Sequence, residues 1–191
     1  ELKKKIFTDL DKICPPQTIL ATNTSCLSVM DIAAVTRRQD KVLGMHFFNP
    51  VPLMKLLELV RTIATSEETL AVARAFGEKV GKEVVTASDT PGFIVNRLLV
   101  PFLLEAVKLL ESGAATKEDI DKAVRLGLNH PMGPFTLADL IGLDTTYFIC
   151  NAMYDEMKEP RFAPPIVLKK MVTAGQYGRK SGKGFYEYKQ T

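Results

Sequence analysis

The chain changes its sequence periodicity once, at Asp89-Thr-Pro-Gly92, and that change limits the folds available to it. Up to this point apolar runs of strand length alternate with stretches of helical period. Beyond it every long segment has helical period, and no strong strand signal comes before Phe185–Tyr188. Alternating strands and helices predict an α/β layer with partly parallel pairing, and the remainder predicts an all-α part. We therefore expect one domain over residues 1–90 and a second over residues 91–191.

Apolar spacing, together with residues that begin or end helices, predicts the individual elements. Strands are expected at 18–22, 41–48, 54–60 and 82–87, and helices at 1–13, 27–35, 66–80 and 93–111. The first helix should bury an apolar face made of Leu2, Ile6, Leu10 and Ile13. The helix after Ser66 should bury Leu70, Ala73, Phe76 and Val80. Thr116 and Asp119 resemble a capping box at the start of a later helix.

Composition excludes several classes of partner. The 191 residues carry 25 basic and 22 acidic side chains, a net charge of +3 with no basic stripe, so we expect no nucleic-acid partner. The three cysteines are far apart and form no CxxC pattern. We therefore expect neither a disulfide framework nor a metal site, and a reducing, cytoplasmic location. No apolar run approaches the ~18 residues of a membrane span, so no membrane partner is expected.

The beginning of the sequence is unusual. Residue 1 is Glu, and an amphipathic helix is already in progress there without a preceding capping residue. We expect a chain cut from something longer, in which case any targeting signal lies outside these residues.

Two polar residues, His46 and Glu58, lie on neighbouring apolar runs, six residues to either side of Pro52. If the runs fold back antiparallel about that centre, imidazole and carboxylate face each other on one side of a sheet. A carboxylate that holds an imidazole fixes its tautomer, and such a pair is suited to proton transfer at neutral pH. A structural hydrogen bond at the edge of the core is the alternative, and both interpretations stay open.

Other polar residues are weaker candidates. Ser25 follows a predicted strand and precedes a predicted helix, where open α/β sheets bind ligands, but a helix N-cap is the simpler explanation. Asn96 is polar in the first turn of an apolar helix, so it bonds locally or faces a polar group. Cys26 has no base nearby in sequence and is interpreted as packing. His130 is interpreted as a loop residue.

Taken together, five segments resemble the L-3-hydroxyacyl-CoA dehydrogenase family, particularly its bacterial 3-hydroxybutyryl-CoA members. These segments are Ala21–Ser25, His46–Pro52 with Glu58, Asp89–Leu98, Pro131–Pro134 and Gly182–Tyr186. The resemblance implies the C-terminal part of a Rossmann-type NAD-binding domain, followed by a helical domain like the C-terminal one of 6-phosphogluconate dehydrogenase. It also implies NAD-dependent oxidation of an L-3-hydroxyacyl-CoA thioester to the 3-oxoacyl-CoA, in fatty acid or butyrate metabolism.

The resemblance also implies roles for individual residues. His46 corresponds to the base, Glu58 to the acid that orients it, and Ser25 and Asn96 to residues that hydrogen-bond the reacting part of the substrate. The positions that approach the cofactor are Ser25, Asn49, Lys3 and Lys180. The family's GxGxxG phosphate turn does not occur in this sequence, so we expect the chain alone to bind NAD poorly and to show little activity.

Two other functions stay open. The chain could be a non-catalytic helical dimerisation module, because Pro91–Leu110 carries more apolar residues than a small helical domain readily covers. The same surplus predicts a homodimer through residues 91–191 if the chain is an enzyme. A dehydrogenase of a free 3-hydroxy acid is the second alternative, because the family's main CoA-contacting segment corresponds to none of these residues.

Overall fold

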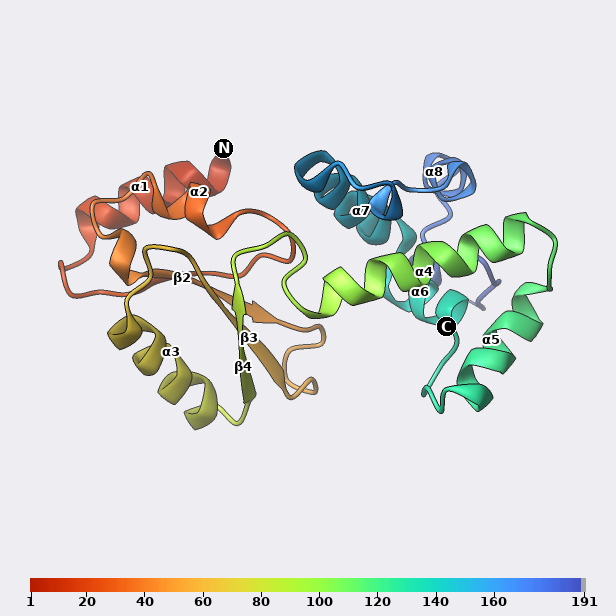
Figure 1. Cartoon of the computed structure of the whole chain (residues 1–191), viewed down its shortest axis with the longest axis horizontal. Coiled ribbons are helices and arrows are strands. Elements are labelled where there is room, and N and C mark those ends of the chain that lie inside the picture. The colour runs from red at the N-terminus through yellow and green to blue at the C-terminus, as the bar shows by residue number, and fades with distance from the viewer. Residues whose placement is uncertain (190–191) are drawn as a thin grey trace. The chain divides into compact units, whose positions relative to one another are not determined.

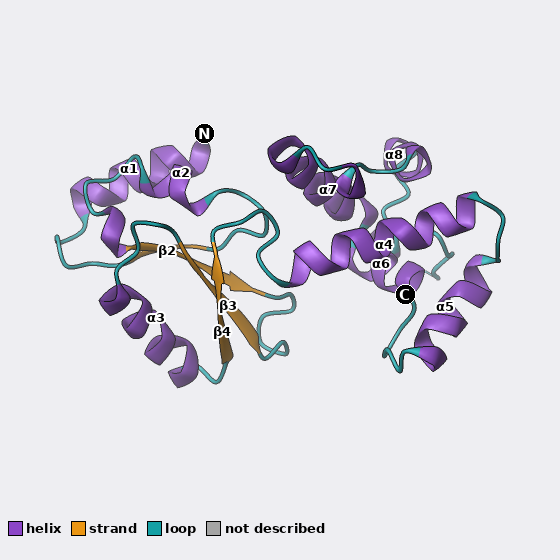
Figure 2. Cartoon of the chain, in the orientation of Figure 1, coloured by secondary structure: helices purple, strands orange, loops and turns teal. Residues whose placement is uncertain are grey.

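Residues 1–189 are described in the computed structural model, and they pack as two compact units. The first unit runs from Glu1 to Ile94 and the second begins at Val95. Among the described residues, strands occur only in the first unit (Figures 1 and 2), as the change in periodicity predicts. The elements of the first unit are α1 (Leu2–Ile13), β1 (Leu20–Thr22), α2 (Val29–Ala33), η1 (Gln39–Lys41), β2 (Val42–Phe47), β3 (Leu56–Arg61), α3 (Glu67–Lys79) and β4 (Glu83–Ser88).

The four strands form one sheet in the order β1-β2-β3-β4. β1 pairs parallel to β2, β2 antiparallel to β3, and β3 parallel to β4. The predicted partly parallel layer is therefore confirmed. The antiparallel pair is the hairpin expected about Pro52, and each of the two parallel pairs has a helix in its connection.

The two faces of the sheet carry separate hydrophobic cores, because neighbouring strand residues point to opposite sides. α1 and α2 cover one face and α3 covers the other (Figure 1). The α1/α2 face buries Phe7, Leu20, Val29, Ile32, Ala33, Val42, Val60, Ala87 and Phe93. The α3 face buries Leu43, Met45, Leu57, Leu59 and Ala73. His46 and Glu58 alternate with the second set, so both belong to the α1/α2 face.

Gly44 allows α2 to lie close to the sheet. A Cβ at this position would stand 2.8 Å from Val60 Cβ and 3.1 Å from Val29 Cγ2. Contacts this short would displace Val60 on β3 and Val29 on α2, at a cost typical of an overpacked core. The glycine two residues before His46 therefore sets the distance between the sheet and the segment that begins α2.

The predicted buried faces of two helices are confirmed only in part: Leu10 on α1 and Leu70 and Ala73 on α3 pack against the cores, while other members are exposed. On α1, Leu2 and Ile13 are 72% and 77% exposed, while Phe7 and Asp11 are buried. The ion pairs that Asp11 makes draw that side of the helix inward. On α3, Phe76 and Val80 are about half exposed, at 51% and 49%, and small residues take part in the contact with the sheet. The buried residues of α3 are Thr69, Ala73 and Gly77, and a Cβ on Gly77 would lie 2.7 Å from Leu57 Cδ2.

The second unit is helical, apart from isolated bridges near its end. The strand signal at Phe185–Tyr188 is wrong, because Lys183 only makes single bridges with Gly178 and Glu187. The N-cap at Thr116 is confirmed, since its hydroxyl accepts the Asp119 N–H at 3.1 Å. The elements are α4 (Val95–Glu111), α5 (Lys117–Gly127), α6 (Pro134–Ile141), α7 (Leu143–Met157), η2 (Pro160–Phe162), α8 (Ile166–Thr173) and η3 (Arg179–Ser181).

The buried carboxylate of Asp139 on α6 holds residues 185–188 in place of strand pairing. Its oxygens accept the N–H groups of Phe185 and Tyr186 at 3.0 and 2.9 Å, and the Tyr188 hydroxyl at 2.9 Å. Burial, and next the hydrogen bond to Asp139, raise the pKa of Tyr188 to about 12. The phenol therefore stays a neutral donor over the whole physiological range.

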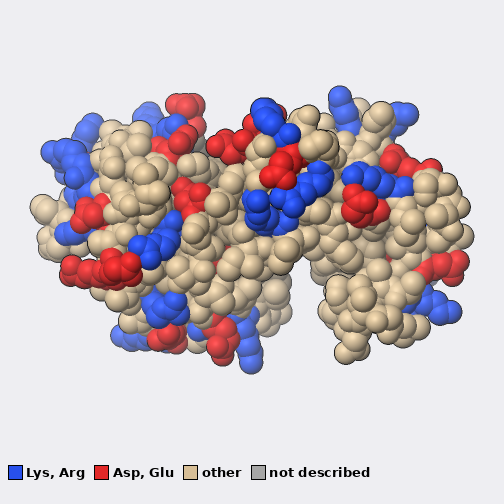
Figure 3. Space-filling view, in the orientation of Figure 1, with Lys and Arg blue, Asp and Glu red and all other residues tan. Residues whose placement is uncertain are grey.

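Basic and acidic side chains are interleaved on the face of the molecule shown in Figure 3, in keeping with the small net charge of +3. No helix within residues 1–189 is both long enough and apolar enough to cross a membrane.

Asp11 joins α1 to the segment between α2 and β2. It is only 5% exposed, and its carboxylate accepts the Nε–H groups of Arg37 at 2.9 Å and Arg38 at 2.7 Å. Arg38 also donates to the carbonyls of Asp11, Cys14 and Pro15. The hydrogen bonds from Arg37, and next those from Arg38, lower the pKa of Asp11 from 3.8 to about 2. Charge-assisted bonds of this kind favour the ionised acid.

We expect Asp11→Asn to lower the free energy of unfolding at neutral pH. A pKa that is lower in the folded state contributes stability above the unfolded value, and this contribution is lost as the pH falls. The difference between wild type and variant should therefore shrink between about pH 4 and pH 2. Urea unfolding across this range measures it, with Asp9→Asn, an exposed acid on the same helix, as the control. A difference that does not change with pH would contradict the argument.

Candidate active site

His46 and Glu58 lie directly opposite each other in the β2–β3 ladder, as predicted. The Nδ1 atom of His46 is 2.6 Å from Oε2 of Glu58, a short, charge-assisted hydrogen bond. Both side chains are buried, His46 at 3% exposure and Glu58 at 0%. Because the carboxylate can only accept, the proton of this bond is carried by Nδ1. Whenever the imidazole is neutral, its lone pair is therefore at Nε2, which can accept a hydrogen bond or a proton.

Ser25 lies at that second nitrogen. Its Oγ is 3.1 Å from His46 Nε2, and it comes from the loop between β1 and α2. The alternative role of Ser25 as a helix cap is wrong, because α2 begins after Ser28, whose hydroxyl accepts the Asp31 N–H. Glu58, His46 and Ser25 thus form one line of hydrogen bonds that runs from the buried carboxylate to a half-buried hydroxyl.

The segment after β4 closes the site within the first unit. The N–H of Ile94 donates to the other carboxylate oxygen of Glu58, Oε1, at 3.2 Å. The ring of Phe93 meets the imidazole edge-on at 5.5 Å between centroids, and the ring of Phe48 lies at 4.5 Å. These two aromatic neighbours were not among the predicted site residues. The nearby Thr90-Pro-Gly92 sequence predicts a tight turn, but it does not show which residues that turn contacts.

This geometry suits the imidazole to accept a proton. A hydroxyl placed near Nε2 can transfer its proton to that nitrogen, and the carboxylate behind Nδ1 then stabilises the imidazolium. The buried position keeps the pair away from bulk water, where the electrostatic interaction would be weaker.

The carboxyl ends of the parallel strands β1 and β2 meet at one edge of the sheet, where open α/β sheets bind ligands. Ser25 follows β1 at this edge, and the exposed Asn49 follows β2 next to a cis Asn49–Pro50 peptide. Lys3 lies there as well, since its Nζ donates to the Asn23 carbonyl at 3.1 Å. Three of the four residues predicted to approach a cofactor therefore share one sheet edge.

The remaining candidates belong to the second unit. Asn96 lies in the first turn of α4 and is 8% exposed. Lys180 forms an ion pair with Asp144, with its Nζ 2.6 Å from Oδ1. Both stay candidates on the strength of the resemblance.

Other potentially reactive groups in the described part of the chain offer less. Burial raises the pKa of Cys26 to about 11 and that of Cys150 to about 12, which keeps both thiols protonated and unreactive. His130 is an exposed loop residue, as predicted. No group of three or more His, Cys, Asp or Glu within residues 1–189 could hold a metal ion.

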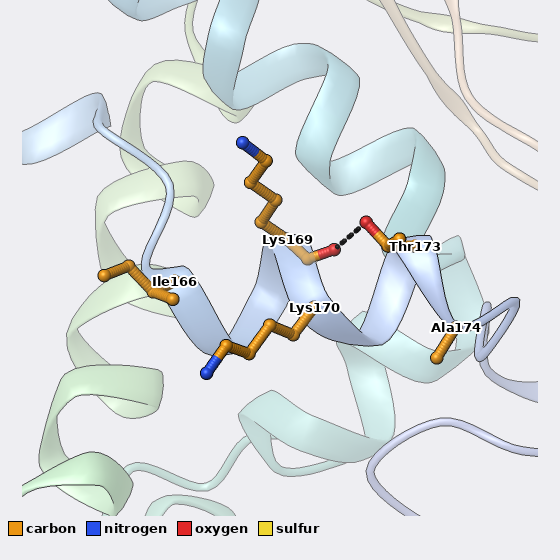
Figure 4. A pocket seen from close by; sticks show the side chains of 5 residues that line it. All are labelled: Ile166, Lys169, Lys170, Thr173 and Ala174. Carbon is orange, nitrogen blue, oxygen red and sulfur yellow. Dashed lines mark hydrogen bonds between the residues drawn. The ribbon is translucent and has the colours of Figure 1, made fainter.

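An open hollow runs along α8 (Figure 4). Its lining consists of Ile166, Lys169, Lys170, Thr173 and Ala174. The Thr173 hydroxyl donates to the Lys169 carbonyl at 2.9 Å, while the two lysine side chains point in different directions. Two solvated ammonium groups on one helix define no converging site, so we assign the hollow no chemistry.

Comparisons with known proteins agree on one family. Residues 1–90 match the family described as 3-hydroxyacyl-CoA dehydrogenase, NAD binding domain, and residues 92–188 match the corresponding C-terminal domain. The chain is 52% identical to a 3-hydroxybutyryl-CoA dehydrogenase of Mycobacterium tuberculosis, over 98% of this chain and 66% of that protein. It is 50% identical to the mitochondrial hydroxyacyl-coenzyme A dehydrogenase of Sus scrofa, over 99% of this chain and 60% of that protein.

A solved structure agrees with these relatives. The crystal structure of the (S)-3-hydroxybutyryl-CoA dehydrogenase from Ralstonia eutropha matches with a TM-score of 0.95 at 46% identity, over 99% of this chain and 67% of that one. The chain therefore spans about two thirds of the length of the relatives that it matches.

We expect Glu58→Gln to reverse the tautomer of His46. The backbone N–H of Ile94 can only donate, so the amide oxygen of the new side chain should stay with it. The amide nitrogen then faces Nδ1, which must become the acceptor, and the proton moves to Nε2. Nitrogen-15 NMR of the imidazole distinguishes the two tautomers, and Glu83→Gln on the exposed side of β4 is the control. An unchanged tautomer would contradict this assignment of donors.

Proposed function

The chain belongs to the 3-hydroxyacyl-CoA dehydrogenase family, and from that premise we propose that it carries the proton-transfer part of an NAD-dependent dehydrogenase site. The reaction is oxidation of an L-3-hydroxyacyl-CoA to the 3-oxoacyl-CoA. The observation that carries this proposal is the buried line from Glu58 through His46 to Ser25. Relatives at about 50% identity are named as dehydrogenases of 3-hydroxybutyryl-CoA or hydroxyacyl-CoA.

In the proposed mechanism, His46 Nε2 takes the proton from the C3 hydroxyl of the substrate as the C3 hydride leaves. Glu58 holds the imidazole through Nδ1 and stabilises the imidazolium that forms. Ser25, 3.1 Å from Nε2, holds the reacting oxygen beside the base, and Asn96 is proposed to hold the substrate from α4. General-base assistance of this kind contributes typically ~10²–10⁴-fold to a rate.

NAD, when bound, supplies the hydride acceptor. The residues present fit its nicotinamide end, because Ser25, Asn49 and Lys3 lie at the sheet edge where α/β folds bind dinucleotides. Lys180 is proposed as a further contact from the second unit. The glycine-rich turn that cradles a pyrophosphate is not among residues 1–191, so these residues supply orientation rather than most of the affinity.

The second unit is proposed to form a homodimer. Large apolar side chains stay exposed on this unit, among them Leu98 at 72%, Phe148 at 59% and Ile166 at 70%. Apolar surface of this kind favours association between copies.

The protein is proposed to work in the cytoplasm. The cysteines Cys14, Cys26 and Cys150 are all free thiols, which suits a reducing compartment.

We expect His46→Gln to lower kcat by ~10²-fold or more and to change the cofactor affinity little, because a general base acts on the transition state. The assay uses 3-hydroxybutyryl-CoA and NAD, with the chain joined to the part of the Mycobacterium tuberculosis relative that it does not cover. This fusion is called the complete protein below.

His130→Gln is the matched control, since it changes the only other histidine, which is exposed. Normal turnover of His46→Gln would remove His46 from the mechanism. A complete protein with no turnover that still dimerises would favour the association module. Turnover of free 3-hydroxybutyrate, with no preference for its CoA thioester, would favour the free-acid alternative.

We expect the chain to sediment as a dimer at micromolar concentration and Leu98→Glu to shift it to a monomer. The carboxylate would place a charge in a proposed apolar interface at the start of α4. Leu2→Glu is the matched control, because Leu2 on α1 has the same exposure of 72% but belongs to the first unit. A stable wild-type monomer would contradict the proposed dimer.

A further inference from the structure

We propose that Asp89 is a positioning residue that fixes the distance between Ser25 and the imidazole of His46. The inference deepens the proposed function and rests on it for the roles of Ser25 and His46. Asp89 is half-buried and precedes the turn Thr90-Pro-Gly92.

Asp89 joins two parts of the first unit that are far apart in sequence. Its carboxylate accepts the N–H of Val29 at 2.9 Å through Oδ1 and that of Met30 at 2.6 Å through Oδ2. Its own N–H donates to the carbonyl of Arg61 at 2.9 Å, at the end of β3. The backbone of Asp89 is thus fixed to the strand that carries Glu58, while its side chain is fixed to the first turn of α2.

This connection limits where Ser25 can lie. The loop that holds Ser25 leaves the sheet after Thr22 and ends where α2 begins at Val29. The first end is fixed by the pairing of β1 with β2, in which Thr22 is aligned with Gly44. The second end is fixed by Asp89. A short loop with both ends held has few conformations, so the position of the helix start determines that of the serine.

The same chain segment reaches the other half of the hydrogen-bonded line. Five residues after Asp89, the N–H of Ile94 binds Glu58 Oε1. Between them Gly92 and Phe93 adopt left-handed backbone conformations, with φ of 79° and 50°. A phenylalanine rarely adopts a positive φ, so its surroundings must hold it there. Residues 89–94 therefore contact the Ser25 side of the site at one end and the Glu58 side at the other.

A simple capping function does not account for this arrangement. α2 has only five residues and already has a local cap, because the Ser28 hydroxyl accepts the Asp31 N–H at 3.1 Å. Asp89 caps the same helix from sixty residues away in the sequence. Its two oxygens bind two adjacent N–H groups, which fixes the direction of the helix start as well as its stability.

The test compares Asp89→Asn with Ser28→Ala, which removes the local cap of the same helix. Nitrogen-15 NMR of the intact chain reports the state of His46 Nε2, and Ser25→Ala gives the reference shift for a lost hydrogen bond. We expect Asp89→Asn to move the Nε2 shift towards that reference and Ser28→Ala to leave it unchanged. The asparagine keeps one acceptor oxygen, and its amide nitrogen, which only donates, would face the other of the two N–H groups.

Asp89→Glu separates position from capping and serves if Asp89→Asn does not fold. It keeps two acceptor oxygens but is one methylene longer, so α2 stays capped and is displaced. We expect its melting temperature to stay close to wild type while the Nε2 shift moves. In the complete protein described above, kcat should fall about tenfold or more in both Asp89 variants and within about twofold in Ser28→Ala, because small displacements of reacting groups are costly.

Two results would overturn the proposal. The first is a wild-type Nε2 shift in both Asp89 variants, and the second is an equal fall in kcat for Ser28→Ala and Asp89→Asn. Failure of the proposed function looks different. In that case the complete wild-type protein has no turnover, while the NMR comparison in the chain itself still decides whether Asp89 positions Ser25.

Discussion

The buried carboxylate of Glu58 is the point on which the first unit depends. A carboxyl group with 0% exposure is costly to bury unless hydrogen-bond partners satisfy it, and here two different parts of the chain supply them. One donor comes from His46 on the neighbouring strand, and the other is the N–H of Ile94 after β4. The register of the hairpin and the path of the chain out of the sheet are therefore tied to one side chain.

The hairpin and its polar pair were predictable because they follow from local symmetry. His46 and Glu58 are equally spaced about Pro52, and a two-residue side-chain period then puts them on one face. The predicted strands and the helical second part followed from periodicity in the same way. The faces of α1 and α3 followed only in part, because they also depend on partners far along the chain. Asp11 draws one side of α1 inward, and Gly77 lets α3 approach Leu57.

The site shows the same division between local and long-range information. The sequence predicted which residue types would take part, and the family resemblance suggested their roles. Neither the sequence nor the resemblance showed that the segment after β4 would donate to Glu58. Neither showed that Ser28, three residues beyond Ser25, would be the cap of α2. The Ile94–Glu58 bond joins residues that lie close together only after folding, and such a bond has no periodic signature. The Ser28 cap is local, since it binds the N–H of Asp31, but the sequence also offers Ser25 as a cap and does not show which serine begins the helix.

The two faces of the sheet differ in what they can tolerate during evolution. The buried core on the α3 face consists of Leu43, Met45, Leu57, Leu59 and Ala73, and hydrophobic replacements of similar volume should be accepted at these positions. A change in the length of strand β2 has a different effect. Deletion of a single residue within β2, ahead of His46, would turn the imidazole towards α3 and bring an apolar neighbour to face Glu58. The strand can therefore vary in composition, but its length between Gly44 and the turn at Pro52 is fixed by the chemistry that it carries.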